Sequence, residues 1–478
     1  MGMPLRRGRG LAGAGLVAVA AALLSACATV PDLGAAPSPK AAAAYPAGRA
    51  LAAPAVEWPQ DRWWASYGDP QLDLLIEEAL AGSPALAAAA ARVRQAEALA
   101  AQAGAALGPQ ASLEASAGAS KQSYNNGVPE LFVPQGWNDV GRVGANLSWQ
   151  LDLFGKNRAL LAAATSEAEA SRAEAAAARL ILATAVAATY ADLAQLHADR
   201  DAAQAALRVR AESERLIGQR VAQGLETRAA QARAHAGRAA AEAELAALDE
   251  RLGLARNRIA ALLGQGPDRG LSVTRPAPRS ARPFGLPDKL QADLIGRRPD
   301  VAAMRLTAEA AGRRIMAAKA DFYPNVNLTA FIGIQSLGLD MLAKSGSTLG
   351  NVGPAVTLPI FSSGRLEGAY GRARADYDAA IAAYDETLAQ AFREVADAAV
   401  SARALDARLG KSREALAASE NAYDLTRQRY TRGLGTYLDV LTAEDALISN
   451  RRAVADLETR AFALDVALIR ALGGGYGA

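Results

Sequence analysis

The sequence contains little of the chemistry on which enzymes depend. Its 478 residues include one cysteine and two histidines, and aromatic residues make up 5%. A single cysteine excludes an intramolecular disulfide, and His197 and His235 belong to no visible metal-ligand cluster. The sequence also lacks a G-x-S-x-G motif, a Walker A motif and a dinucleotide fingerprint. We therefore predict that the protein is not an enzyme and holds no metal or cofactor.

The sequence also has little excess of positive over negative charge. The net charge is +3, and Arg6, Arg7 and Arg9 supply it from residues 1–26, which contain no acid. Without that segment the chain is balanced, so it offers no basic patch for nucleic acid. Alanine, by contrast, is abundant, and it favours long helices that pack closely.

The N-terminus has the layout of a secreted lipoprotein precursor. Three arginines precede an apolar run at residues 11–24, which is shorter than the roughly 20 residues of a membrane-spanning helix. The run leads into residues 24–27 (LSAC), which resemble a bacterial lipobox. We predict a signal peptide at residues 1–26 and a covalent lipid on Cys27, and Ala28 fits sorting to the outer membrane. The alternative is a buried or incidental thiol.

Landmarks recur along the chain at a nearly constant spacing, as in a duplicated protein. Residues 220–227 (RVAQGLET) match residues 429–436 (RYTRGLGT), 209 positions later. Earlier in each unit, prolines recur 215 positions apart: Pro84 with Pro299, and Pro109 with Pro324. We infer an internal duplication. The Gly-, Pro- and Arg-rich residues 264–287 between the units predict an irregular linker.

Four segments of about ten residues alternate between apolar and polar side chains. They are residues 111–120 and 142–149 in the first unit, and 325–334 and 351–360 in the second. The alternation predicts strands with one apolar and one polar face. Their length fits strands tilted across a bilayer, but half-buried strands of a soluble sandwich share the pattern. Pro354 is awkward within the ladder of the fourth strand.

Very long helical segments follow the strands. Residues 155–220 contain no proline, and at about 1.5 Å per residue such a helix extends roughly 100 Å. Residues 364–432 are its counterpart, and shorter helices are predicted at 227–263 and 436–472. Apolar residues of the last helix form two adjacent seams, so this helix can contact two neighbours. A ring of helices requires such a surface, although a compact bundle also allows it.

Four strands are too few to close around a pore. Lipid does not tolerate unpaired backbone, and bacterial barrels begin at about eight strands. Strands in a membrane would therefore have to be pooled from several chains, and the helices would prolong the pore.

Three segments carry a resemblance to a known family. Residues 64–72 (WASYGDPQL) resemble its opening signature, and residues 149–155 (WQLDLFG) and 358–365 (LPIFSSGR) resemble its strand-to-helix junctions. The family is that of TolC-like outer membrane factors. Together with the lipobox, the chain resembles their lipoprotein branch, the OprM- and NodT-like proteins. The resemblance implies an α+β membrane protein that forms a homotrimer. It implies a 12-stranded β-barrel, with four strands per chain, continued by a 12-helix periplasmic α-barrel.

The resemblance also assigns residues near the ends of the long helices. Tyr430 and Asp439 match positions of the periplasmic gate. The alternative is a solvated aspartate at a helix start and a tyrosine that only packs against its neighbours. The residues 209 positions earlier are Val221 and Ala230, so the polar pair exists in the second unit alone.

Two departures from the family pattern occur nearby, because Gly435 replaces an arginine and Thr442 replaces an aspartate found in relatives. The repeated turns themselves are expected to contact a periplasmic adaptor protein. The residues assigned to that contact are Gly224, Leu225, Thr227, Gly433, Leu434 and Thr436.

These observations predict an outer-membrane channel subunit of a tripartite efflux pump, lipid-anchored and extended by a periplasmic tunnel. It would passively export small molecules, expected to be drugs, delivered by an adaptor and an inner-membrane transporter of the resistance-nodulation-division type. The alternatives are a duct for type I protein secretion and a structural coiled-coil envelope lipoprotein. The predicted domains are a signal peptide (1–26), a lipid-anchored segment (27–68), a first efflux repeat (69–266), a linker (267–286) and a second efflux repeat (287–478).

Overall fold

The computed structural model describes residues 30–277, 284–288, 290–362 and 364–477. The predicted signal peptide and the predicted lipidation site at Cys27 lie outside these residues. The chain divides into two compact units, which are considered separately. Unit 1 comprises the chain up to residue 39 with residues 93–170 and 304–383, and unit 2 comprises residues 40–92, 171–303 and 384–478.

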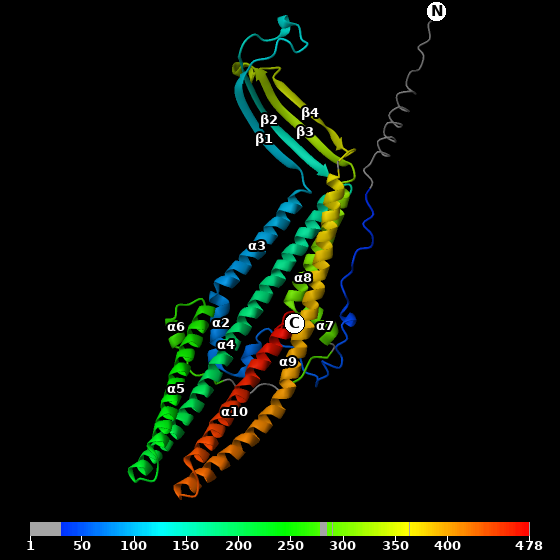
Figure 1. Ribbon diagram of the computed structural model, residues 1–478. Helices are drawn as coiled ribbons and strands as arrows, with labels where there is room; N and C mark the ends of the chain where they lie inside the picture. Colours follow the sequence, from blue (N-terminus) through cyan, green and yellow to red (C-terminus); the bar gives the residue numbers. More distant parts are fainter. Residues whose placement is uncertain (1–29, 278–283, 289, 363, 478) are drawn as a thin grey trace, which may run out of the picture. The chain divides into compact units, whose positions relative to one another are not determined.

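Unit 1 contains one antiparallel sheet in which the strands are neighbours in chain order, β1-β2-β3-β4 (Figure 1). The four segments with period-two alternation each form a strand, as predicted. Within this described sheet, β1 and β4 pair on one side only, so both edges are open. The bounds are β1 (Gln110–Ser120), β2 (Asn138–Leu151), β3 (Asn325–Leu337) and β4 (Thr348–Thr357).

The sheet leaves its apolar face uncovered. Leu113 is 76% exposed, Ile332 67% and Val352 77%, and the register of the strands places all three on the same face. An ordinary soluble sheet buries such a face against a core. This exposure therefore shows that the apolar face has no cover within the described part of the chain.

The fourth strand differs from its predicted position. The alternation indicated residues 351–360, whereas β4 begins at Thr348 and ends at Thr357. Pro359 has no N–H to give to a ladder, and the strand ends before it. Pro354, in contrast, lies inside β4 opposite Leu328, and it is tolerated because β4 is an edge strand.

Four helices run from one unit into the other along the chain. They are α3 (Pro84–Ala105), α4 (Lys156–Ala222), α8 (Pro299–Ala320) and α9 (Arg365–Thr431). Asp152 starts α4, because its carboxylate accepts hydrogen bonds from the backbone N–H groups of Asn157 at 3.0 Å and Arg158 at 2.9 Å. These bonds lower the pKa of Asp152 although its burial opposes them. The absence of proline beyond this cap allows 67 residues of uninterrupted helix.

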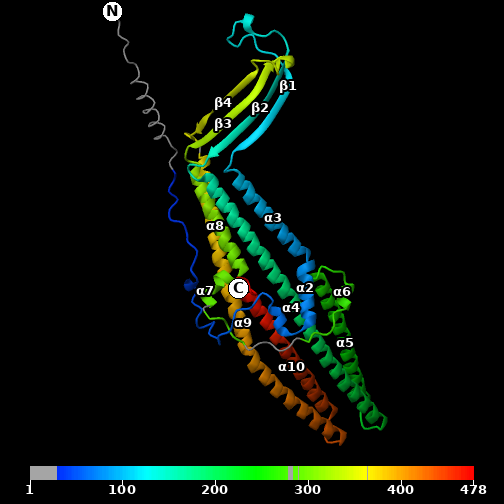
Figure 2. The ribbon, with the colours of Figure 1, turned by 180° about the vertical axis from the view of Figure 1, so that it is seen from behind.

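Unit 2 is helical, with two helical hairpins, α4–α5 and α9–α10. Seen from either side, the helices lie in the order α5, α4, α10, α9 (Figures 1 and 2). Its other helices are α2 (Pro70–Gly82), α5 (Arg228–Leu262), α6 (Asp268–Leu271), α7 (Leu290–Arg297) and α10 (Tyr437–Ala471). The predicted linker therefore contains one helical turn, α6, and Arg269 of that turn pairs with Glu78 at 2.8 Å.

The main hydrophobic core of unit 2 contains three aromatic side chains that directly precede α2 in the chain. Trp63, Trp64 and Tyr67 are each 2% exposed, and the Tyr67 ring meets Phe462 of α10 edge-on at 4.7 Å. Asp69 caps α2 and also accepts a hydrogen bond of 2.7 Å from the Tyr190 hydroxyl of α4. Much of the segment that carries the family resemblance, including Trp64, Tyr67 and Leu72, is therefore buried in this core.

The N-terminal segment lies along α9 and is held mainly by its backbone. In unit 1, Arg374 donates to the carbonyl oxygen of Gly34 at 3.1 Å. In unit 2, Arg403 donates to the carbonyl oxygens of Ala50 at 3.0 Å and Ala52 at 2.7 Å. The segment also uses a side chain of its own, because the Tyr45 hydroxyl donates to the Asp385 carbonyl oxygen at 3.1 Å and the Tyr45 ring lies 5.5 Å from that of Phe392.

Candidate functional site at the helical turns

The turns that close the two helical hairpins have the same backbone design. Gly224 and Gly433 have φ of +74° and +76°, which L-residues with a side chain rarely adopt. The next N–H donates to the carbonyl oxygen five residues earlier, from Leu225 to Arg220 and from Leu434 to Arg429, at 2.8 Å in both cases. This is the Schellman arrangement that ends a helix at glycine.

Each turn then starts the next helix with a threonine. The hydroxyl of Thr227 accepts from the Ala230 N–H at 3.2 Å, and that of Thr436 accepts from the Asp439 N–H at 3.3 Å. Between glycine and threonine, Leu225 and Leu434 are 59% and 66% exposed. All six residues predicted for adaptor contact therefore lie in two matching turns, each with one outward leucine.

Tyr430 connects the second hairpin to the first. Its side chain is 1% exposed, and its hydroxyl donates to Glu226 Oε1 at 3.0 Å. The Arg220 guanidinium lies 4.6 Å from the centre of the ring. Burial, together with the Glu226 carboxylate, raises the pKa of the Tyr430 hydroxyl. The tyrosine therefore remains a neutral hydrogen-bond donor at any physiological pH.

Asp439 is placed differently from Tyr430. It is exposed, and its Oδ2 accepts from the Thr436 N–H and hydroxyl, both at 2.9 Å, which completes a capping box for α10. These hydrogen bonds lower the pKa of Asp439. The two predicted gate residues do not touch, but a Cβ built on Gly435 would lie 3.7 Å from both Asp439 Oδ2 and the Tyr430 nitrogen.

Sequence reasoning missed a buried carboxylate deeper in the second hairpin. Glu444 of α10 is 0% exposed, accepts from the Ser213 hydroxyl at 2.6 Å and pairs with Arg210 at 2.9 Å, both from α4. Burial raises the pKa of Glu444, although Ser213 and Arg210 oppose the rise. A signal existed in the sequence, because Tyr437, Val440, Glu444 and Leu447 follow the 3-4-3 spacing of a helix seam.

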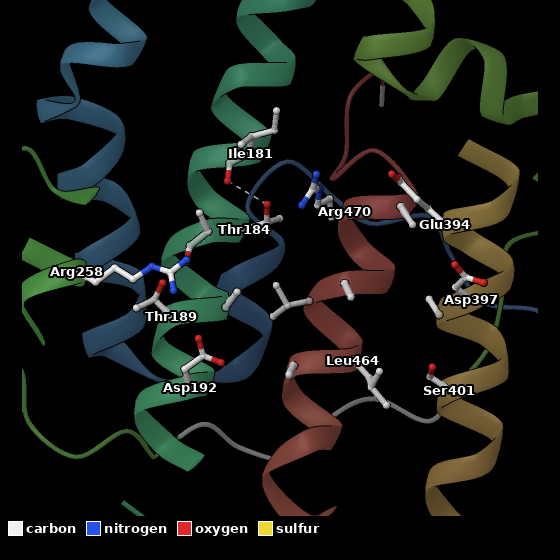
Figure 3. Close-up of a pocket in the computed structure, with 17 residues that line it drawn as sticks. Ile181, Thr184, Thr189, Asp192, Arg258, Glu394, Asp397, Ser401, Leu464 and Arg470 are labelled. Carbon is white, nitrogen blue, oxygen red and sulfur yellow. Dashed lines mark hydrogen bonds between the residues drawn. The ribbon is translucent and has the colours of Figure 1, made fainter. Parts of the chain in front are cut away.

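A cavity of about 530 Å³ is bordered by α4, α10 and α9, with Arg258 of α5 also lining it. Figure 3 shows the side chains that line it. Its α9 side carries Glu394, Asp397 and Ser401, and Arg470 lies on α10. Glu394 is already paired with Arg298 at 2.8 Å. Over the described residues, no group of three His, Cys, Asp or Glu side chains is placed to hold a metal ion.

Known proteins share this architecture. The family model described as outer membrane efflux protein matches residues 75–265 and 290–474. The chain is 46% identical to the outer membrane protein VceC of Vibrio cholerae, whose crystal structure it matches with a TM-score of 0.82 over 88% of this chain and 100% of that chain.

Two curated relatives extend the comparison. The fusaric acid resistance protein FusA of Burkholderia cepacia is 36% identical over 326 residues, which are 66% of this chain and 60% of FusA. The multidrug resistance outer membrane protein MdtP of Escherichia coli strain K12 is 30% identical over 429 residues, 88% of this chain and 87% of MdtP. The predicted resemblance to TolC-like factors and the α+β fold are thereby confirmed. The chain belongs to the outer membrane efflux protein family, the outer-membrane channels of efflux pumps.

Proposed function

We propose that three copies of this chain form one exit channel of a tripartite efflux pump. Their sheets would join into a 12-stranded barrel in the outer membrane, and their helices would form a 12-helix periplasmic tunnel. The observation that carries this proposal is the sheet of unit 1, which has two open edges and an exposed apolar face. In lipid such edges must be paired, and sister chains provide the missing strands.

The proposal includes an origin by internal duplication. Each half of the chain contains a helix, a strand pair, a 67-residue helix, a glycine turn and a 35-residue helix. The family model also matches the chain in two segments, one per half. We retain the predicted domain limits, with repeats at residues 69–266 and 287–478 joined by the linker at 267–286.

The lipid anchor on Cys27 also belongs to the proposal, with cleavage after residue 26 and residues 27–68 as the anchored segment. Gly34 is fixed to Arg374, nine residues into α9, which corresponds to about 13 Å from the start of that helix. Seven extended residues from Gly34 to Cys27 reach up to about 25 Å. The lipid can therefore enter the bilayer near the end of the strands.

The proposed partners follow from the two matching turns. Their exposed leucines, Leu225 and Leu434, suit an apolar contact with the tips of a periplasmic adaptor, which would connect the channel to an inner-membrane transporter of the resistance-nodulation-division type. Tyr430 and Asp439 would control the periplasmic aperture. The transported compounds would be small molecules, including drugs, and the chain itself would act without catalysis, metal or cofactor.

The orientation of the strands provides the test. Leu328 and Thr329 are neighbours on β3 and face opposite sides of the sheet. In intact cells, a membrane-impermeant thiol reagent should modify the variant Thr329→Cys from the pore and leave Leu328→Cys, facing lipid, unmodified. Equal modification of both variants, or a purified chain that is a monomer in buffer without detergent, would contradict the channel and favour a structural envelope lipoprotein.

A further inference from the structure

The polar face of the sheet carries a single cation and a single aromatic ring. Residues opposite one another in a sheet share a face, and the register pairs Asn146 with Phe331, Gly144 with Gly333 and Arg142 with Gln335. Arg142 is the only cation in the four described strands, and Phe331 is the only aromatic residue on this face. The other residues of this face are mainly serine, asparagine, glutamine, threonine and glycine.

Two glycines form a seat for the phenylalanine ring. A Cβ added to Gly144 would lie 2.5 Å from Phe331 Cζ, and one added to Gly333 would lie 2.9 Å from the same atom. Both distances are shorter than real Cβ contacts allow. The ring therefore lies over bare backbone of β2 and β3, a position that a side chain at either glycine would block.

The guanidinium of Arg142 covers the other side of this ring. Its central carbon lies 4.5 Å from the ring centre, within the range of a cation–π contact. Arg142 is exposed, and no carboxylate within 4.0 Å of it occurs among the residues that the structure describes. Glu114, the only carboxylate on this face, lies opposite Gly144 and makes no ion pair there. The result is a planar positive charge held on the wall with its outer surface free.

We propose that Arg142, seated on Phe331, is a binding site on the channel wall for planar aromatic carboxylates. The inference rests on the proposed channel, in which three copies of the pair would lie at one level of the pore. The guanidinium edge would donate to the carboxylate, and its outer face would stack on the aromatic ring of the solute. A ring of three fixed positive charges would also enrich anions at that level.

A cysteine beside Arg142 reports the local charge without depending on the periplasmic gate. Ser116 of β1 lies directly opposite Arg142 and on the same face. In intact cells, the variant Ser116→Cys is treated from outside with anionic and cationic methanethiosulfonate reagents of similar size. Adding Arg142→Gln should lower the anionic rate and raise the cationic rate, each by up to about fivefold, as expected for one charge a few ångströms away in water.

Two matched controls accompany this measurement. Ser120→Cys lies on the same strand and face about 13 Å further along, beyond the screening length, so Arg142→Gln should change its ratio little. Leu113→Cys, on the apolar face of the same strand, should not react with either reagent.

Ligand binding is measured as protection of Ser116→Cys by naphthalene-2-carboxylate. Protection should be lost in Arg142→Gln. It should also be lost in Gly144→Ala, which displaces the ring but keeps the charge. Gly118→Ala is the control, because a Cβ at this glycine of the polar face would meet nothing within 4 Å. Arg142→Lys should keep the rate ratio and lose protection, since an ammonium cannot stack.

The outcomes distinguish failure of the proposed channel from failure of the proposed binding site. If Ser116→Cys reacts with neither reagent in assembled protein, the proposed channel is wrong. If Ser116→Cys reacts, but adding Arg142→Gln leaves its rate ratio unchanged and neither Arg142→Gln nor Arg142→Lys reduces its protection, the channel stands and the binding site is overturned. Variants are compared only as detergent-stable oligomers, and Arg142→Lys carries the protection test if Arg142→Gln does not assemble.

Discussion

The two helical hairpins share a turn but differ in what holds them. In the first hairpin, Glu214 of α4 pairs with His235 of α5 at 2.9 Å on the protein surface. The residues 209 positions later are Tyr423 and Glu444, both buried. A polar contact at the surface of the first hairpin thus corresponds to a buried polar cluster in the second, which obtains its partners from α4.

The same difference recurs at the turn. Val221 and Ala230 of the first hairpin correspond to Tyr430 and Asp439 of the second. Tyr430 depends on Glu226, which the first hairpin contributes. We conclude that Tyr430 and Glu444 of the second hairpin are buried polar groups that bond to the first hairpin.

The largest effect is expected for Glu444→Ala. It would leave Arg210 without its buried partner and Ser213 without its acceptor, a loss of about 3 kcal/mol in the free energy of unfolding. His235→Ala, the matched change in the first hairpin, should cost less than about 0.5 kcal/mol because the site is exposed. Thermal unfolding of detergent-purified protein, followed by circular dichroism, measures both. Similar losses for the two variants would contradict the asymmetry.

The turn glycines should behave alike in the two hairpins. Gly224→Ala and Gly433→Ala each force a Cβ into the left-handed region, at a cost of about 1–2 kcal/mol. Gly435→Ala is the control, because its Cβ would make only ordinary contacts at 3.7 Å. The same thermal measurement applies. A clear difference between the two glycines would show that the turns are not equivalent, contrary to their matching bonds.

Tyr430→Phe should loosen the second hairpin by about 1 kcal/mol, because it removes the hydrogen bond to Glu226 and leaves the ring in place. Hydrogen exchange of the amides at residues 432–436 should become faster, while those at 223–227 in the first turn remain protected. Faster exchange in both turns, or in neither, would argue against a one-sided dependence.

The smallest effect concerns pH. The pKa of Glu444 is raised in the folded protein, chiefly by burial, so the folded state holds its proton more tightly than the unfolded state. The part of the stability that comes from this tighter proton binding is therefore fully present below the ordinary pKa near 4.5 and is lost as pH rises through the raised value, whereas the contacts with Ser213 and Arg210 are a separate contribution. Arg210, Ser213 and Asp445 face the carboxyl and set the size of this change. Glu444→Gln should flatten the dependence of thermal stability on pH above 4.5; an unchanged slope would assign it to another group.

Features with a local cause could be predicted from the sequence. Residues 364–432 were predicted as a helix and α9 spans Arg365–Thr431, because Gly364 and Gly433, at φ of +81° and +76°, end the pattern on both sides. The strands were predictable for the same reason, since alternation is a property of neighbouring residues. β4 (Thr348–Thr357) lies three residues before the predicted segment 351–360, because alternation alone does not reveal where pairing to β3 stops.

Contacts between distant segments could not be predicted in this way. The sequence indicated Tyr430 through a resemblance, but its partner Glu226 lies 204 residues away and is set by how α9 docks near α4. Glu444 was overlooked because charged residues on long helices normally face solvent. The 3-4-3 spacing with Tyr437 and Leu447 shows that its position belongs to a seam.

The way in which the N-terminal segment is bound has a consequence for its evolution. Arg374 and Arg403 contact carbonyl oxygens of Gly34, Ala50 and Ala52, groups that every amino acid carries. Substitutions at Ala50 and Ala52 can therefore accumulate without loss of these bonds, whereas loss of Arg403 removes them at once. Selection should act on the two arginines of α9 and on Tyr45, whose hydroxyl donates to the Asp385 carbonyl oxygen at 3.1 Å, and leave the alanines free to diverge.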